Sequence, residues 1–327
     1  MYETGRNLVL MLYNGVYIFG AHPILPNLYH IERVIVNHIK TNTSNKMNMK
    51  LTNVMAVAIS ALSLMACNSN SPHTEEKAEP VVPKIKAEEV SYKADSVTSK
   101  SYYAYDENIQ GKRPAILVVP EWWGLGDYVK NRVKQLAELG YVAMAVDMYG
   151  DGKTGEDPTS AGALAMPFYK DSALLKSRMD AAIAQLQSMP LVDTSKIAAI
   201  GYCFGGYVAL NEAKLGAPLK GVVSFHGGLG GVQPNKSLLK AEILICHGAI
   251  DNFVPEAEVA AFKKEMDSIG AKYTFKVYDS ATHAFTNPGA TEKGIKYSMP
   301  IKYNAAADTA SWNDMKTFFA GLFGEKK

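Results

Sequence analysis

Cysteine and arginine are both scarce in this chain of 327 residues. The three cysteines, Cys67, Cys203 and Cys246, match neither a disulfide framework nor a zinc knuckle in their number and spacing. Five of the 34 basic residues are arginines, so few guanidinium groups are present for two-pronged binding of carboxylates. These arginines are Arg6, Arg33, Arg113, Arg132 and Arg178.

An excess of one charge sign is also missing. The net charge is +2, with acidic and basic residues mixed along the chain, and we therefore expect no nucleic-acid partner. With 47% hydrophobic and 20% charged residues, the chain can build a large globular core, most of it in one α/β domain.

Residues 47–66 have the layout of an export signal. Lys50 precedes an apolar run, and Leu64-Met65-Ala66-Cys67 resembles a bacterial lipobox, whose cysteine is acylated and becomes the mature N-terminus. Asn68 follows rather than aspartate, so we expect a lipid anchor in the outer membrane, with the protein facing the periplasm or the surface. The alternative is an uncleaved anchor or a buried helix over residues 51–66, although a spanning helix needs about 20 residues.

Three further segments follow from this interpretation. An export signal belongs at the N-terminus, so residues 1–46 are expected to precede the true start, at Met47 or Met49, and to lie outside the fold. Residues 67–87 are polar and proline-rich, which is typical of a flexible tether. Residues 88–327 are predicted to form the folded domain.

Strand and helix patterns alternate through this domain. The first part, up to about residue 106, predicts two antiparallel strands with a turn near Asp95. Helices are expected after a capping Asp127, over 171–188 and over 305–323. The alternation predicts an α/β fold, a mainly parallel doubly wound sheet with helices on both faces.

The stretch KIAAIGYCFGGYVAL places Cys203 between a buried strand and a helix. Gly201 and Gly205 bracket the cysteine, which is the pattern of the nucleophile elbow of α/β-hydrolases. A tight turn of this kind needs residues without a Cβ and pushes the nucleophile into the open at the strand tip. Here the nucleophile is a thiol, whose anion is already strongly reactive.

An acid and a base follow Cys203 in the order that α/β-hydrolases use. Asp251 and His283 each come just after a predicted strand, where sites of parallel sheets form. His226 and His247 also lie near strand tips, and zinc bound by His226, His247 and His283 is an alternative that no metal-binding spacing supports. We expect His247 to be a structural hydrogen-bonding group and Cys246 a small buried residue.

Four motifs together resemble the dienelactone hydrolase family over about residues 88–323: PEWWGL at 120–125, GYCFGG at 201–206, HGAIDNFVP at 247–255 and THAFTNP at 282–288. The resemblance implies an α/β-hydrolase fold and a catalytic triad of Cys203, Asp251 and His283. Glu121 matches a family glutamate that contacts the resting thiol and swings away when substrate binds. The backbone N–H groups of Phe204 and Trp122 would form the oxyanion hole.

The chain departs from the family pattern at the residues that bind the substrate carboxylate. The best-studied family activity acts on an anionic lactone held by two arginines, and this chain offers Asn287 in one place and Gly150-Asp151 in the other. Lys153 could replace an arginine only as a point charge. We expect a partly aromatic pocket that includes Trp122, Trp123, Tyr149 and Phe253, with Asn287.

The sequence therefore predicts a monomeric hydrolase of small-molecule esters or lactones, without metal or cofactor. It would work through a thioester acyl-enzyme and be attached to a membrane by its lipid anchor. The alternative is a non-catalytic lipoprotein that binds small molecules on a hydrolase scaffold. A complete Cys, Asp, His and Glu set favours the enzyme, because a decayed site usually loses at least one member.

Overall fold

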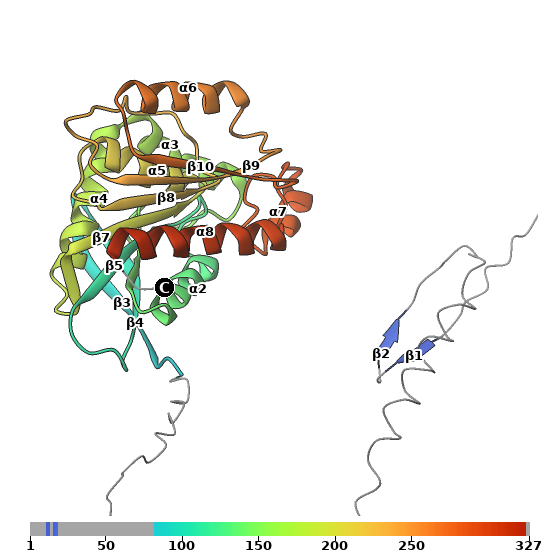
Figure 1. Ribbon diagram of the computed structural model, residues 1–327, viewed down its shortest axis with the longest axis horizontal. Coiled ribbons are helices and arrows are strands. Elements are labelled where there is room, and N and C mark those ends of the chain that lie inside the picture. Colours follow the sequence, from blue (N-terminus) through green and yellow to red (C-terminus); the bar gives the residue numbers. More distant parts are fainter. Residues whose placement is uncertain (1–10, 14–15, 19–81, 325–327) are drawn as a thin grey trace, which may run out of the picture. The chain divides into compact units, whose positions relative to one another are not determined.

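The computed structural model describes residues 11–13, 16–18 and 82–324 (Figure 1). The first two ranges are the short antiparallel strands β1 (Met11–Tyr13) and β2 (Val16–Ile18). The predicted signal at 47–66, the lipidation site Cys67 and most of the tether lie outside the described residues. No helix within the described ranges has the length and hydropathy of a membrane span.

An eight-stranded sheet forms the centre of the folded unit, in the order β10-β9-β8-β7-β5-β6-β4-β3. The strands from β5 to β10 run parallel to one another, while β4 runs antiparallel to both β6 and β3. The predicted mainly parallel sheet is confirmed. The strands are β3 (Ile85–Ala94), β4 (Val97–Asp106), β5 (Arg113–Val119), β6 (Val142–Ala145), β7 (Val192–Tyr202), β8 (Gly221–Phe225), β9 (Glu242–Gly248) and β10 (Tyr273–Tyr278).

Helices cover both faces of this sheet. One face packs against α2 and α8, which lie side by side in Figure 1, and the other packs against α3 to α6. Successive residues of β5 alternate between the two cores, as a strand buried on both faces must. The helices are α2 (Asp127–Glu138), α3 (Pro158–Lys170), α4 (Ser172–Gln187), α5 (Phe204–Lys214), α6 (Glu256–Ser268), α7 (Ala290–Tyr297) and α8 (Ala305–Phe323).

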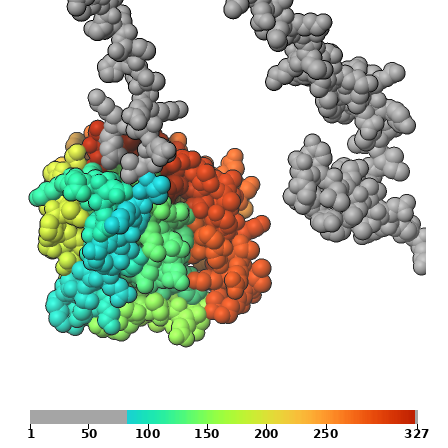
Figure 2. Space-filling view, turned by 90° about the horizontal axis from the view of Figure 1, so that it is seen from below, coloured from blue at the N-terminus to red at the C-terminus, as the bar shows by residue number. Residues whose placement is uncertain are grey.

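The predicted hairpin and two of the predicted helices agree with the structure. β3 and β4 pair around a turn at Asp95, whose φ of 51° is left-handed, and they form a ridge beside α2 (Figure 2). α8 has the predicted bounds, and Asp171 caps α4 by accepting hydrogen bonds from two backbone N–H groups. The prediction for Asp127 was wrong, because Gly126 is the N-cap and Asp127 lies inside the first turn of α2.

The turn between β7 and α5 is the most crowded part of the backbone. Cys203 is its single residue, with φ 52° and ψ −117°. A Cβ on Gly201 would come within 1.9 Å of the Gly205 carbonyl oxygen, and a Cβ on Gly205 within 2.1 Å of the Val119 carbonyl oxygen. Only glycine therefore allows α5 to begin against the end of β5.

Gly205→Ala should destabilise the fold strongly, because backbone rather than a movable side chain occupies the space of the new methyl group. We expect a loss of about 3 kcal/mol or more in the free energy of unfolding, measured by urea denaturation. Gly321→Ala is the matched control, since nothing lies within 4 Å of its added Cβ in α8. That control should gain up to about 1 kcal/mol from helix propensity. Equal stability of the two variants would contradict the steric account.

Candidate active site

Cys203 lies at the carboxyl end of β7, next to β5 in the middle of the sheet. Its backbone N–H donates to the Phe225 carbonyl oxygen at 3.0 Å and to His226 Nδ1 at 3.1 Å. The side chain is half-buried, whereas Phe204, the first residue of α5, is fully buried. The N–H of Phe204 belongs to the first turn of the helix, where backbone donors have no intrahelical partner.

His283 and Asp251 form a buried pair beside Cys203. His283 Nδ1 lies 2.9 Å from Asp251 Oδ2, and the two residues are 7% and 6% exposed. Burial alone would lower the pKa of His283. The negative charges of Cys203 and Asp251, and hydrogen bonds to both, outweigh burial and raise this pKa to about 10. The geometry thus favours a protonated His283, an imidazolium beside the Asp251 carboxylate and the Cys203 sulfur.

Glu121 follows β5 and is 4% exposed. Asn287 Nδ2 donates a hydrogen bond of 2.6 Å to Glu121 Oε2. Burial raises the pKa of this carboxyl group, while the Asn287 hydrogen bond and the charge of Lys293 oppose the rise. A buried carboxylate with a raised pKa can change its protonation state within the site.

A cavity of about 570 Å³ opens over these groups. Cys203, Glu121 and His283 line it, and aromatic side chains form much of the remaining wall. The predicted pocket residues Trp122, Trp123 and Phe253 are among the lining residues. Two further aromatic residues, Tyr169 from α3 and Tyr207 from α5, line it as well and were missed from the sequence.

The structure places two of the expected pocket residues behind the wall. Tyr149 is 6% exposed, and its hydroxyl donates to the Trp122 carbonyl oxygen at 2.8 Å. Asn287 holds Glu121 instead of facing the cavity. Lys153, the possible substitute for an arginine, pairs with Asp151 at 3.3 Å on an exposed loop and is not among the lining residues.

His226 supports the site from behind. Its ring packs against that of His283 with 5.2 Å between centroids, and burial lowers its pKa well below the ordinary value. A neutral ring whose Nδ1 accepts the Cys203 N–H carries its proton on Nε2, which lies 2.7 Å from the Thr286 hydroxyl. His226 is therefore held in one tautomer between the β7–α5 turn and the loop that carries His283.

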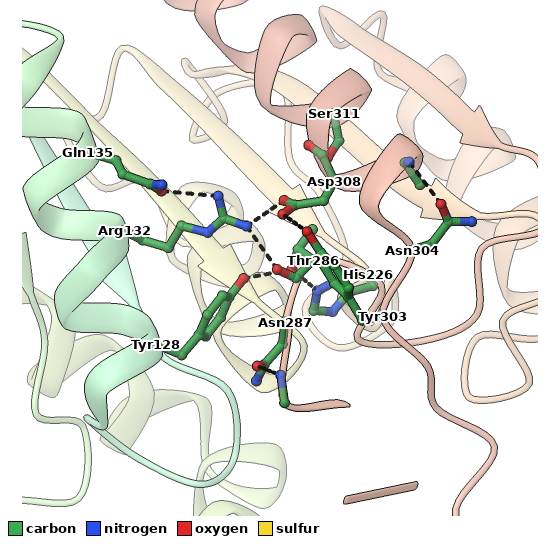
Figure 3. Close-up of polar contacts among 12 residues, drawn as sticks. Tyr128, Arg132, Gln135, His226, Thr286, Asn287, Tyr303, Asn304, Asp308 and Ser311 are labelled. Atoms are coloured by element: carbon green, nitrogen blue, oxygen red, sulfur yellow. Dashed lines mark hydrogen bonds and ion pairs between the residues drawn. The ribbon is translucent and has the colours of Figure 1, made fainter. Parts of the chain in front are cut away.

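A buried ion pair extends this support to two helices (Figure 3). Arg132 of α2 pairs with Asp308 of α8, and its Nη2 also donates to the Thr286 carbonyl oxygen at 2.8 Å. The Tyr128 hydroxyl lies 2.7 Å from that of Thr286. Arg132 of α2 thus joins α8, through Asp308, to the histidine loop, through Thr286.

The remaining candidates lie apart from these contacts. His247 packs against Phe275 with 5.6 Å between ring centroids, and Cys246 is fully buried. Across the described part of the chain, no three His, Cys, Asp or Glu side chains are arranged to hold a metal ion. The alternative of a zinc site built on His226, His247 and His283 therefore has no support in this geometry.

Comparison with known proteins identifies the family. The model of the dienelactone hydrolase family matches residues 100–323. The chain belongs to the dienelactone hydrolase family. A solved dienelactone hydrolase-like promiscuous phosphotriesterase from metagenomic libraries is 36% identical, with a TM-score of 0.69 over 73% of this chain and 98% of that one.

Curated family relatives carry names of lactone hydrolases. A Methylorubrum extorquens protein named "Putative carboxymethylenebutenolidase" is 30% identical over 54% of this chain and 64% of its own length. A Bradyrhizobium protein named "Probable 2-oxo-3-(5-oxofuran-2-ylidene)propanoate lactonase" is 29% identical over 54% of this chain and 75% of its own. The chain is thus a hydrolase of the dienelactone hydrolase type with the α/β-hydrolase fold.

Arg132→Ala should lower the free energy of unfolding by about 3 kcal/mol, because it removes a buried guanidinium and leaves the partly buried Asp308 carboxylate without its partner. Urea denaturation measures the loss. Lys176→Ala is the matched control, because it removes an exposed ion pair of 2.8 Å with Asp180 and should cost less than about 0.5 kcal/mol. A small effect in both variants would mean that Arg132 does not hold the two helices together.

Proposed function

We propose that this protein is a thiol-dependent carboxylic ester hydrolase that cleaves an ester or lactone of a small molecule. The observation that carries the proposal is the buried His283–Asp251 pair next to a thiol on a strained elbow, at the floor of a cavity. Solvated loop residues would not explain this arrangement. The motif order in the chain and the names of the family relatives support the same reaction class.

Acylation begins when the Cys203 thiolate, paired with the His283 imidazolium, attacks the substrate carbonyl carbon. The carbonyl π electrons move to oxygen, and the N–H groups of Phe204 and Trp122 stabilise that oxyanion, each worth about 3 kcal/mol in related chemistry. The tetrahedral intermediate collapses, and its C–O bond to the leaving group breaks. His283 gives its proton to the departing alkoxide, which leaves a thioester on Cys203.

In deacylation His283 acts as a general base, whereas in acylation it acted as a general acid. Neutral His283 takes a proton from water, and the resulting hydroxide attacks the thioester carbonyl. Collapse of this second intermediate expels the Cys203 thiolate, restores the ion pair and releases the carboxylic acid. Asp251 keeps the proton on Nδ1 throughout, so that Nε2 faces the reacting atoms.

Glu121 controls formation of the Cys203 thiolate in this proposal. Its buried carboxylate lines the same cavity as Cys203, and a negative neighbour disfavours the thiolate. Asn287 holds the carboxylate by one hydrogen bond, which a substrate can exchange for another. Movement of Glu121 away from the thiol would leave the thiolate to His283.

The location of the enzyme follows from its N-terminal sequence. We infer that residues 47–66 are removed and that Cys67 carries the lipid that anchors the protein in the outer membrane. The lipobox-like LMAC and the polar tether after it support this inference.

Cys203→Ala and His283→Ala should each lower kcat for a chromogenic ester by about 10³-fold or more. Each variant removes one residue of the proposed triad, and the remaining residues cannot act without it. Cys246→Ala is the matched control: it deletes a fully buried thiol on β9, which β8 separates from β7, and it should keep its kcat. If the Cys203 variant kept substantial activity, the thiol mechanism would be wrong. A wild-type protein that binds esters without turnover would favour the non-catalytic lipoprotein.

Mass spectrometry of the membrane fraction should find a mature chain that begins at a lipidated Cys67. Cys67→Ser should move the protein out of that fraction, since it removes the acceptor for the lipid. A wild-type protein without lipid, starting upstream of residue 47, would rule out the anchor.

A further inference from the structure

Apart from the catalytic candidate His283, the described residues that line the cavity above Cys203 include acidic groups and no basic ones. Glu121 lies at its catalytic end and Glu258, from the first turn of α6, lies elsewhere in its wall. No lysine or arginine of the described chain is among the lining residues. Aromatic side chains also line the cavity, among them Trp122, Tyr169 and Phe253.

Glu258 lines the same cavity as Cys203, the candidate nucleophile. Its Oε1 accepts hydrogen bonds from the N–H groups of Leu229 at 2.6 Å and Gly230 at 3.1 Å, which holds one wall of the cavity in place. Tyr169, in the cavity wall, interacts electrostatically with both Cys203 and Glu258. Burial raises the pKa of its phenol, and the charges of Cys203 and Glu258 raise this pKa further, so both groups lie within electrostatic reach of one ring.

The nearby cations do not reach the cavity surface. Lys214 is fully buried, is not among the lining residues, and its Nζ donates to the Leu229 carbonyl oxygen at 3.2 Å. Lys293 lies over the ring of Trp123, 4.1 Å from its centroid. A substrate in the cavity therefore meets the Glu258 carboxylate directly, and meets the two ammonium groups only through intervening protein.

We propose that this cavity selects its substrate by charge, with ammonium-bearing acyl groups preferred to uncharged ones and anionic ones rejected, and that Glu258 determines the preference. The proposal rests on the esterase function above. A carboxylate attracts a cation and repels an anion, and aromatic faces add a favourable contact for a quaternary ammonium group. The preference is opposite to that of a site built to hold a substrate carboxylate.

Three p-nitrophenyl esters of equal shape test this preference. They are 5,5-dimethylhexanoate, 4-(trimethylammonio)butyrate and 4-sulfobutyrate, whose tetrahedral end groups carry no charge, one positive charge and one negative charge. We expect kcat/KM to fall in the order ammonium, neutral, sulfonate. Glu258→Gln keeps the shape and the acceptor oxygen, and should lower the ammonium-to-sulfonate ratio by about fivefold or more.

Glu256→Gln is the matched control. It removes the same charge from the same turn of α6, but Glu256 is exposed and is not among the lining residues. Its ammonium-to-sulfonate ratio should stay within about twofold of the wild-type ratio, because solvent screens an exposed charge. A wild-type enzyme that prefers the sulfonate ester, or equal ratios in Glu258→Gln and wild type, would overturn the proposal.

A second readout does not depend on turnover. Methanethiosulfonates with a trimethylammonioethyl or a sulfonatoethyl group convert the Cys203 thiolate into a mixed disulfide and release methanesulfinate, and peptide mapping follows this residue alone. The cationic-to-anionic ratio of labelling rates should fall in Glu258→Gln and stay unchanged in Glu256→Gln. If the esters are inert but this difference appears, the esterase function fails while the charge selection of the cavity stands. If the ratio is the same in all three proteins, the charge selection is wrong.

Discussion

The rest of the site depends on the close backbone contact between the β7–α5 turn and the end of β5. Gly205 fits against the Val119 carbonyl oxygen only because it has no side chain, and this contact fixes Cys203 at a positive φ. A strained residue of this kind persists only when its surroundings over-determine it. The glycines therefore allow a strained turn that places the half-buried Cys203 at the middle of the sheet.

Around that turn, polar groups are positioned in two layers. Asp251 and His283 come from loops after β9 and β10 and touch each other directly. Behind them, His226 and Thr286 connect the β7–α5 turn to the histidine loop, and the Arg132–Asp308 pair ties that loop to α2 and α8. The outer layer is largely buried and hydrogen-bonded, so it can hold the inner groups at fixed distances.

Much of the fold and of the inner layer was predictable from sequence, because both depend on local patterns. Buried strands, the glycine-bracketed cysteine and the chain order of Asp251 and His283 are all visible in short windows. α3 and α7 were not anticipated. Pro167 lies inside α3 and hides its helical pattern, although Asp157 and Ser160 form a capping box that signals its start.

The pocket wall and the supporting layer were harder to predict, because they depend on contacts between distant segments. Tyr149 and Asn287 were expected in the pocket, yet their hydrogen bonds turn them toward Trp122 and Glu121. Tyr169 and Tyr207 reach the cavity only through the packing of α3 against α5. Arg132 and Asp308 lie 176 positions apart, and nothing in either sequence window indicates the other.

The central claim is a covalent thioester on Cys203, and rapid quenching tests it most directly. The full-length wild-type protein is mixed with p-nitrophenyl butyrate and stopped in acid during turnover, and intact mass and peptide mapping then locate any added group. The account predicts one butyryl group on Cys203 that neutral hydroxylamine removes. A butyryl group on another residue, or unmodified protein throughout active turnover, would contradict it.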